Sequence, residues 1–323
     1  MVYLYEETEN GIRISRVFGH DGIVEILEEV EGRPVTELGA YIFSDRMDQK
    51  DREQLLEQGI LCTEEGKRIF SVDKLPEIAG ERLTELVLPR TLEKIGPYAF
   101  YNCRKLTDIS FGGALKDLGA GALTGCHQVR RLTVNMEENR ESCLREILTE
   151  LPEALCVELY VNGEKGCFWF PEFFEEGVEN TPARILENHV HGSGIRYRNC
   201  FQHRVLDTGE YDRLFAYAIA WEQEETVLHL ALGRVFLPLE LTEKARENYL
   251  EFLRKHIKNA VILLGEQREY ETLGNLLPMV RPDRETVEAM LESAQRSEDS
   301  RWTGILMEYM DGLGKKKRRS FDL

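Results

Sequence analysis

The chain has 323 residues, 42% of them hydrophobic and 31% charged, which suits a folded protein with two or three domains. Its formal net charge of −17 disfavours binding to nucleic acid or to an anionic membrane surface. The first residues lack the pattern of a signal peptide, no apolar run is long enough to span a bilayer, and the seven cysteines form no disulfide framework, so we expect a cytoplasmic protein with reduced thiols.

The N-terminal segments at residues 12–17 and 23–27 have the composition of short strands. We expect them to cover one end of the repeated structure that follows, because an exposed sheet edge needs a cover. Residues 35–43, VTELGAYIF, resemble part of the repeat unit but stand out of phase with it. Residues 45–80 therefore look like an insertion, which carries an expected helix at residues 48–58.

A repeat is the strongest feature of the sequence, since residues 83–105 and 106–128 align without a gap. Each unit supplies a short strand and then turns back through Gly96 or Gly119, where we expect a backbone angle that a β-carbon would oppose. One unit cannot close its own core, so like side chains of successive units should stack into a buried ladder. A third unit opens at Val129. The matching pairs include Leu83 with Leu106, Leu86 with Ile109, Leu88 with Phe111, Ile95 with Leu118 and Cys103 with Cys126.

The pattern L-x-x-L-x-L-P…L-x-x-I-G-x-Y-A-F-x-N-C-x-x-L of residues 83–106 resembles the BspA-type, or treponemal, leucine-rich repeat of bacterial proteins. The likeness covers about residues 23–134, and the second unit departs from it with Leu123 where the family has Phe. The resemblance implies a binding scaffold and leaves the ligand open. Many members of the family are secreted or surface-attached, in contrast to the cytoplasmic location expected here.

Residues that alternate with the apolar strand positions should face outward and form two stripes on the sheet. These stripes are the first candidates for a binding surface, with plain solvated packing as the alternative. Cys103 and Cys126 occupy the same repeat position, so we expect small buried residues there, not a redox pair or a metal site. The six candidate binding residues are Glu85, Val87, Asp108, Ser110, Arg131 and Thr133.

The middle of the chain predicts a helix at residues 143–151 and then a hairpin. Its two strands, at residues 157–161 and 164–170, are joined by Asn162-Gly163, which suits a two-residue type I′ turn. The second strand is aromatic, so we expect the hairpin to be buried on both faces and to close the stack of repeats.

Residues 186–204 are the most chemically dense stretch, and two hypotheses attach to it. His189, His191, Cys200 and His203 together offer a zinc-like ligand set, although neither H-x-H nor C-x-x-H is a specific signal. The positive side chains of Arg184, Arg196, Arg198 and Arg204 suggest an anion or acidic-peptide site. The alternative is pairing across an internal interface with Glu172, Glu175, Glu176 and Glu179.

From about residue 207 onward the period becomes helical, with Asp207, Thr242 and Asp283 as N-caps and Pro278 as the end of a helix. Residues 226–231, TVLHLA, are similar to the T-P-L-H-x-A signature of ankyrin repeats, with Val227 in place of Pro, and generic helical-repeat packing fits as well. The basic run at residues 315–319 predicts a solvated tail, or a contact with an acidic partner or with the protein's own acidic surface.

Together these features predict an α+β protein. We expect a leucine-rich-repeat β-solenoid with an N-terminal cap and an inserted helix at residues 1–140, a connecting helix and aromatic β-hairpin cap at 141–205, an all-α helical-repeat domain at 206–314 and a basic tail at 315–323. The predicted function is that of a non-enzymatic scaffold of the bacterial cytoplasm that needs no cofactor and binds a protein or peptide, not nucleic acid or membrane. The alternative is a metal-dependent protein or enzyme that uses the cluster at residues 189–203, which stoichiometric zinc in the purified protein would support.

Overall fold

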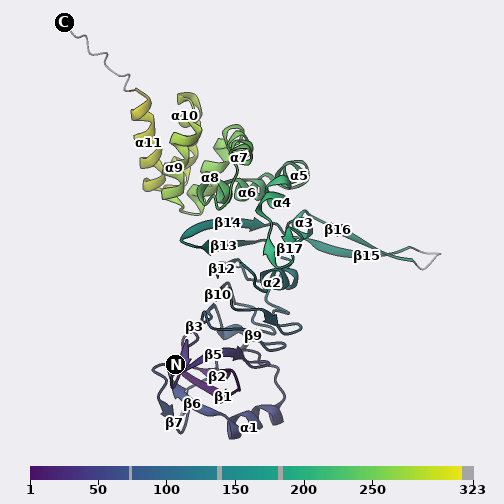
Figure 1. Ribbon diagram of the computed structural model, residues 1–323. Coiled ribbons are helices and arrows are strands. Elements are labelled where there is room, and N and C mark those ends of the chain that lie inside the picture. The colour runs from purple at the N-terminus through teal and green to yellow at the C-terminus, as the bar shows by residue number, and fades with distance from the viewer. Residues whose placement is uncertain (73–74, 137–139, 181–184, 315–323) are drawn as a thin grey trace. The chain divides into compact units, whose positions relative to one another are not determined.

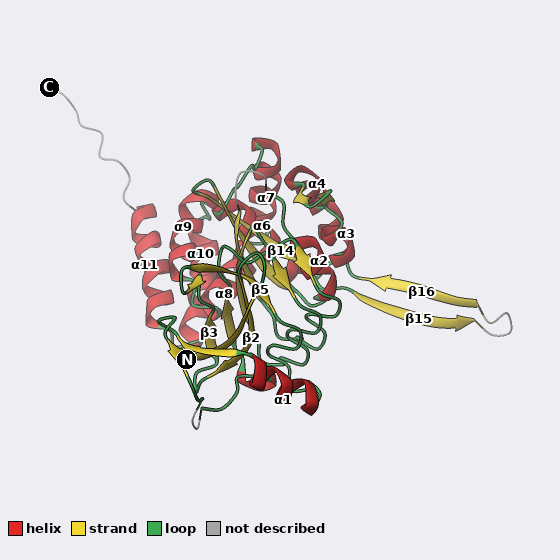
Figure 2. Cartoon of the chain, turned by 60° about the horizontal axis from the view of Figure 1, so that its bottom comes forward, coloured by secondary structure: helices red, strands yellow, loops and turns green. Residues whose placement is uncertain are grey.

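The computed structural model describes residues 1–72, 75–136, 140–180 and 185–314 (Figure 1). The chain divides into two compact units, Met1–Tyr217 and Ala218–Leu323, which are described separately below. The first unit combines strands with short helices and the second is helical, which agrees with the α+β class (Figure 2). The finer domain boundaries at residues 140 and 205 stay predictions, and the basic tail lies outside the described residues.

One sheet of the first unit contains the repeated strands, in the order β14-β13-β12-β10-β8-β3. All neighbours run parallel except β13 and β14, which are antiparallel. Leu86, Ile109 and Leu132 lie side by side in this register and are buried, as the repeat predicts. The strands are β3 (Ile23–Glu25), β8 (Glu85–Val87), β10 (Asp108–Gly112), β12 (Arg131–Met136), β13 (Leu155–Val161) and β14 (Glu164–Phe170).

The N-terminal cap is smaller than predicted, because β3 belongs to the repeat sheet itself. Val24 pairs beside Leu86, so residues 23–25 form the first strand of the stack. A second sheet, β11-β9-β5-β2-β1-β6-β7, holds the other strands of the repeats together with the N-terminal strands. Its members are β1 (Val2–Glu7), β2 (Ile12–Phe18), β5 (Arg33–Leu38), β6 (Ile60–Thr63), β7 (Arg68–Ile69), β9 (Lys94–Ile95) and β11 (Asp117–Leu118), and β4 (Glu29–Val30) pairs with β5.

The match between residues 35–43 and the later repeat unit is confirmed. Leu38 pairs beside Ile95 in parallel strands. The turns that follow stack as well, with ring centroids 5.3 Å apart for Tyr41 and Tyr98 and 5.8 Å apart for Phe43 and Phe100. The insertion between these two repeat units contains α1 (Gln49–Gln58). The side chain of Asp48 caps the first turn of this helix.

Gly96 and Gly119 are required for a reason other than the predicted one. Neither has a positive φ, whereas Tyr98 in the same turn does, at 55°. A β-carbon on Gly119 would instead lie 2.3 Å from the backbone nitrogen of Pro97 in the preceding repeat. On Gly96 it would lie 2.5 Å from the nitrogen of Ala40. The glycines therefore allow successive repeats to approach each other closely.

Cys103 and Cys126 are buried at equivalent positions, as expected. The thiol of Cys103 donates to the carbonyl oxygen of Phe43 at 3.3 Å, and that of Cys126 donates to Phe100 at 3.1 Å. Burial raises the pKa of the Cys126 thiol to about 12 and also raises the pKa of Cys103. Both residues serve as small core side chains that tie one repeat to the next.

The predicted type I′ turn joins β13 and β14, with φ values of 51° at Asn162 and 86° at Gly163. The hairpin buries one face fully and the other only in part, so the predicted burial of both faces is met only in part. Leu155, Val157 and Phe168 point into the core, whereas the alternate residues are half-buried. The reason is that β13 pairs with β12 as a further strand of the repeat sheet, so its second face continues the sheet surface.

Replacing Asn162 by valine should destabilise the protein by about 1–2 kcal/mol, because a β-branched residue resists the left-handed backbone that this turn requires. Urea denaturation measures the change. Asn162→Gly keeps the turn accessible and should change the free energy of unfolding by less than about 0.5 kcal/mol. Equal effects of the two substitutions would contradict the assigned turn type.

The remaining elements of the first unit precede or follow the hairpin in the chain. Helix α2 precedes it and buries Leu144, Ile147 and Leu148, as predicted. Strands β15 and β16 form a two-stranded ribbon that extends away from the rest of this unit (Figures 1 and 2). The remaining elements are α2 (Leu144–Glu150), β15 (Phe174–Asn180), β16 (Ile185–His191), α3 (Gly194–Arg198), β17 (Phe201–Gln202), β18 (Val205–Leu206), α4 (Thr208–Arg213) and α5 (Phe215–Trp221), whose last residues fall in the second unit.

The second unit is a row of three helix pairs, α6 with α7, α8 with α9 and α10 with α11. The first helices of successive pairs pack on each other, and so do the second helices, which is how helical repeats build a continuous core. The ankyrin resemblance itself stays a prediction. The helices are α6 (Glu224–Phe236), α7 (Glu243–Lys255), α8 (Ile257–Glu266), α9 (Tyr270–Val280), α10 (Arg284–Arg296) and α11 (Ser300–Gly314).

The caps Thr242 and Asp283 are confirmed, since each side chain accepts a hydrogen bond from a backbone N–H in the first turn of its helix. The prediction that Pro278 ends its helix is wrong. This residue lies in the last turn of α9, which continues to Val280 and ends at Arg281 in the left-handed conformation. Within the described residues, no helix combines the length and apolar character needed to cross a membrane.

Candidate interaction surface

The exposed side of the six-stranded sheet, here called the outer face, carries all six predicted binding residues. Strand register places them in two adjoining rows that run across the sheet. The first row is Ile23, Glu85, Asp108, Arg131, Cys156 and Trp169, and the second is Glu25, Val87, Ser110, Thr133, Glu158 and Cys167.

The outer face follows from strand alternation. Because Leu86, Ile109 and Val157 point into the core, their neighbours along each strand point outward. Sequence reasoning found the contributions of β8, β10 and β12 but missed those of β3, β13 and β14. The signal for β13 was present, since Cys156, Glu158 and Tyr160 alternate with buried apolar residues like the earlier strands.

The positive charges of the outer face that the structure describes are paired within it. Arg131 Nε lies 3.8 Å from Asp108 Oδ1 on the neighbouring strand, and Lys165 Nζ lies 2.8 Å from Glu158 Oε2. Burial opposes the charge of Lys165, but its bonds to Glu158 and Tyr160 outweigh burial and raise its pKa to about 12. The hydroxyl of Tyr160 also donates to Glu158 at 3.2 Å. This end of the face is therefore a preorganised polar network.

The opposite end of the outer face is partly apolar. Ile23 is 48% exposed and Val87 is 40% exposed, on neighbouring strands at the β3 edge. Exposed aliphatic side chains beside acidic ones, Glu25 and Glu85, are the kind of surface that a partner can cover. Trp169 lies at the far edge of the same row, half-buried on β14.

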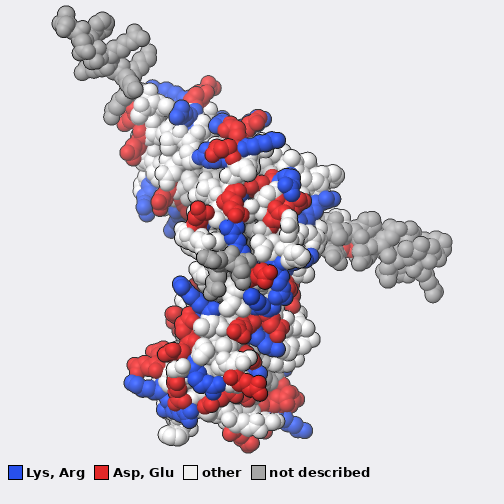
Figure 3. Space-filling view, viewed as in Figure 1, with Lys and Arg blue, Asp and Glu red and all other residues white. Residues whose placement is uncertain are grey.

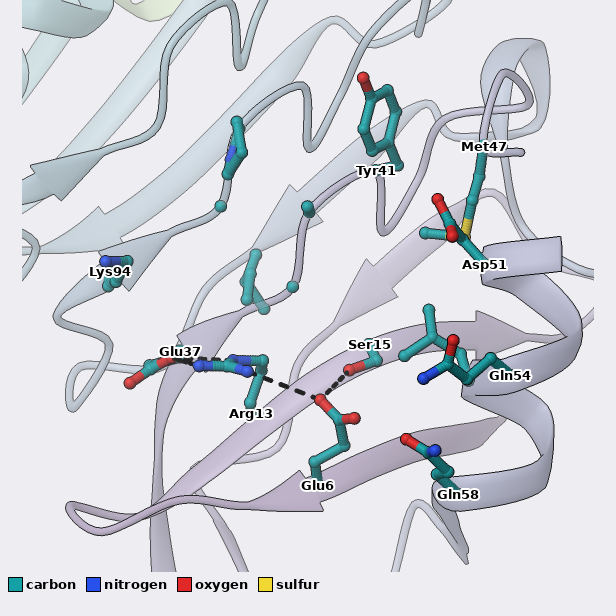
Figure 4. A pocket seen from close by; sticks show the side chains of 16 residues that line it. Glu6, Arg13, Ser15, Glu37, Tyr41, Met47, Asp51, Gln54, Gln58 and Lys94 are labelled. Carbon is teal, nitrogen blue, oxygen red and sulfur yellow. Dashed lines mark hydrogen bonds and ion pairs between the residues drawn. The ribbon is translucent and has the colours of Figure 1, made fainter. Parts of the chain in front are cut away.

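A pocket of about 500 Å³ lies elsewhere in the first unit, between α1 and the strands that carry Glu6, Arg13 and Glu37 (Figure 4). Arg13 pairs with Glu37 at 2.6 Å and with Glu6 at 3.6 Å, so this wall is neutralised internally. The α1 side of the pocket presents Asp51 together with two glutamine side chains. The described lining contains no histidine or cysteine, and its Ser15 hydroxyl donates to Glu6 at 3.2 Å.

Among the predicted metal ligands whose side chains the structure describes, His191, Cys200 and His203 do not form a common site. The ring of His191 stacks on Phe174, with centroids 4.6 Å apart. Cys200 is buried and donates to the carbonyl oxygen of Arg196 at 3.4 Å, while His203 is exposed. The side chain of His189 lies outside the description. Among the described residues, no group of three or more His, Cys, Asp and Glu side chains is placed to hold a metal ion, and the metal alternative stays a prediction.

The predicted anion site is wrong for Arg198, which is buried and directs its guanidinium at backbone carbonyls. Arg204 pairs with Glu146 at 2.6 Å, and the guanidinium of Arg196 lies 4.4 Å from the ring centre of Tyr217. Arg184 lies outside the described residues. Arg196, Arg198 and Arg204 therefore each contact groups of the first unit and do not converge on one anion site.

The comparisons identify the repeats. The family model described as "BspA type Leucine rich repeat region (6 copies)" matches residues 79–150. No curated protein matches the chain. A leucine-rich repeat protein of T. pallidum is similar with 18% identity and a TM-score of 0.30, over 50% of this chain and 62% of that one. A leucine-rich cell surface protein of Faecalibacterium prausnitzii has 15% identity and a TM-score of 0.26, over 49% of this chain and 41% of that one. The chain thus spans less than two thirds of the length of either protein.

Proposed function

Because residues 79–150 form a BspA-type leucine-rich repeat region, we propose that this protein is a non-enzymatic scaffold that binds a protein or peptide partner through the outer face. The observation that carries the proposal is the register, which aligns outward-facing side chains from six strands into continuous rows. In this proposal the stacked strands are a short β-solenoid that the β13–β14 hairpin closes, and the helix pairs of the second unit are a separate repeat surface.

The composition of the outer face favours a protein partner. Trp, Tyr and Arg are the side chains that most often dominate binding energy, and the face offers Trp169, Tyr160 and Arg131. The net charge of −17 opposes nucleic acid, and acidic and basic side chains are interspersed on the view in Figure 3. The seven free thiols support the further proposal that the protein acts in the reducing cytoplasm of a bacterium.

Placing two arginines in the centre of the outer face should abolish partner binding. Ser110 and Thr133 are neighbours on β10 and β12, so the double substitution Ser110→Arg and Thr133→Arg adds two bulky charges to the second row. Partners that co-purify with the wild-type protein from its native cytoplasm should fall at least about tenfold, since a misplaced interfacial charge costs several kcal/mol. Quantitative mass spectrometry of the co-purified proteins measures the loss.

Thr124→Arg is the matched control, because Thr124 is exposed on a repeat turn and not on the sheet. The control should retain the wild-type set of partners. If the double variant kept the same partners at wild-type levels while remaining folded, the outer face would not be the binding surface.

A further inference from the structure

Two cysteines lie together on the outer face, in contrast to the other five. Cys156 on β13 and Cys167 on β14 have their sulfur atoms 3.0 Å apart. Cys156 pairs beside Trp169 and Cys167 beside Glu158, so the two thiols meet diagonally across the antiparallel strands. Both are half-buried, whereas the remaining cysteines are buried.

We propose that Cys156 and Cys167 form a dithiol modification site, which reacts with small-molecule disulfides to give a reversible intrachain disulfide. The sulfur atoms need to approach by only about 1 Å to reach the bond length of a disulfide. The Asn162-Gly163 turn holds the two strands in register, so the pair is already aligned before oxidation.

The other cysteines lack both access and a second sulfur at bonding distance in the part of the chain that the structure describes. Burial raises the pKa of Cys143 and of Cys200 to about 12 and that of Cys62 to about 11. These thiols are buried and shielded from a dissolved disulfide, whereas Cys156, whose pKa is also raised, is half-buried and lies beside Cys167. The chemistry should therefore be confined to the pair on β13 and β14.

The reaction proceeds by two exchanges with a disulfide RSSR. The neighbouring sulfur of Cys167 and burial raise the pKa of Cys156. One sulfur of the pair, written here as Cys167, attacks first as its thiolate. This attack forms a mixed disulfide Cys167–S–SR and releases one thiolate RS⁻. Cys156 then loses its proton to solvent and attacks the sulfur of Cys167, which releases the second RS⁻. The protein is oxidised by two electrons, and RSSR is reduced to two RSH.

The disulfide would change the surface proposed to bind the partner. It would lie between the two rows of the outer face and tie β14 to β13 beside Arg131 and Glu158. Oxidation itself needs no partner, so the dithiol chemistry can succeed or fail independently of the proposed function.

The full-length reduced protein is incubated with glutathione disulfide, the remaining thiols are blocked with N-ethylmaleimide after an acid quench, and the peptides are mapped by mass spectrometry. We expect the main product to contain a Cys156–Cys167 disulfide, with the other five cysteines recovered as N-ethylmaleimide adducts. Phenylarsine oxide, which bridges two thiols with loss of water, should bind the reduced protein at one equivalent.

The variants Cys156→Ser and Cys167→Ser separate a dithiol from two independent thiols. Each should lose the intrachain bond and the arsenical binding, and Cys156→Ser should stop at a mixed disulfide on Cys167. The wild-type measurement stands without the variants if either fails to fold. Mixed disulfides or cross-linked dimers in the wild-type protein, without the intrachain bond, would overturn the proposal.

Discussion

Replacing Gly119 by alanine is expected to destabilise the first unit by about 3 kcal/mol, because overpacked sites of this kind force the backbone to move. The added β-carbon would lie 2.3 Å from Pro97 N and 2.4 Å from the carbonyl carbon of Gly96. Both are backbone atoms of the adjacent repeat, so no side-chain rotation relieves the overlap. Urea denaturation of the full chain measures the loss, with hydrogen exchange of peptides from residues 83–134 to follow the first unit alone.

Gly209→Ala is the matched control in the same unit. A β-carbon at Gly209 meets its nearest atom, the Oδ1 of Asp207, at 3.4 Å, which is ordinary contact. The control should change the free energy of unfolding by less than about 0.5 kcal/mol. If Gly119→Ala were equally mild, successive repeats would not approach each other as closely as the structure has them.

The ladder of stacked repeats was predictable, because side chains at equivalent positions must meet when identical units stack. Leu38 and Ile95 align in the sequence, and they lie side by side in the structure. The role of Gly119 was not predictable in the same way. A left-handed backbone and a close approach both exclude a β-carbon, and only the positions of the neighbouring atoms distinguish them.

The extent of the outer face was underestimated for a similar reason. The insertion before residue 80 places β3 out of phase with the later repeats. The hairpin signal at Asn162 predicts the pairing of β13 with β14 but not the pairing of β13 with β12. The proximity of the two thiols could have been predicted from the sequence. The turn at Asn162-Gly163 fixes Cys156 opposite Trp169 and Cys167 opposite Glu158. A diagonal contact between the thiols follows from that register.

The buried environment of Arg198 could not be predicted from the sequence. Arg198 stands among several arginines, yet its guanidinium is buried and donates to the carbonyl oxygens of Leu151 at 2.7 Å and Glu153 at 2.8 Å. It also bonds to the carbonyl oxygens of Leu148 and Pro171. Irregular loops on both sides of the hairpin thus depend on one side chain, which no local pattern in the sequence reveals.

Arg198→Met should therefore destabilise the first unit by about 4 kcal/mol, because it leaves several buried carbonyl groups without donors. Burial lowers the pKa of Arg198 to about 10, so the guanidinium remains charged at neutral pH and its hydrogen bonds are charge-assisted. Arg198→Lys keeps a charge but loses the planar fork of donors, and we expect an intermediate loss. Urea denaturation, with hydrogen exchange of peptides from residues 144–170, measures each variant.

Arg204→Met applies the same substitution to a partly exposed arginine of the same unit. Arg204 pairs with Glu146 at 2.6 Å, and both side chains are more than a third exposed, so its loss should cost less than about 1 kcal/mol. A large difference between the two variants would show that buried carbonyl groups, not positive charge, are what Arg198 stabilises. Equal losses would instead mean that water replaces the guanidinium of Arg198, and that the loops around the hairpin hold their conformation without it.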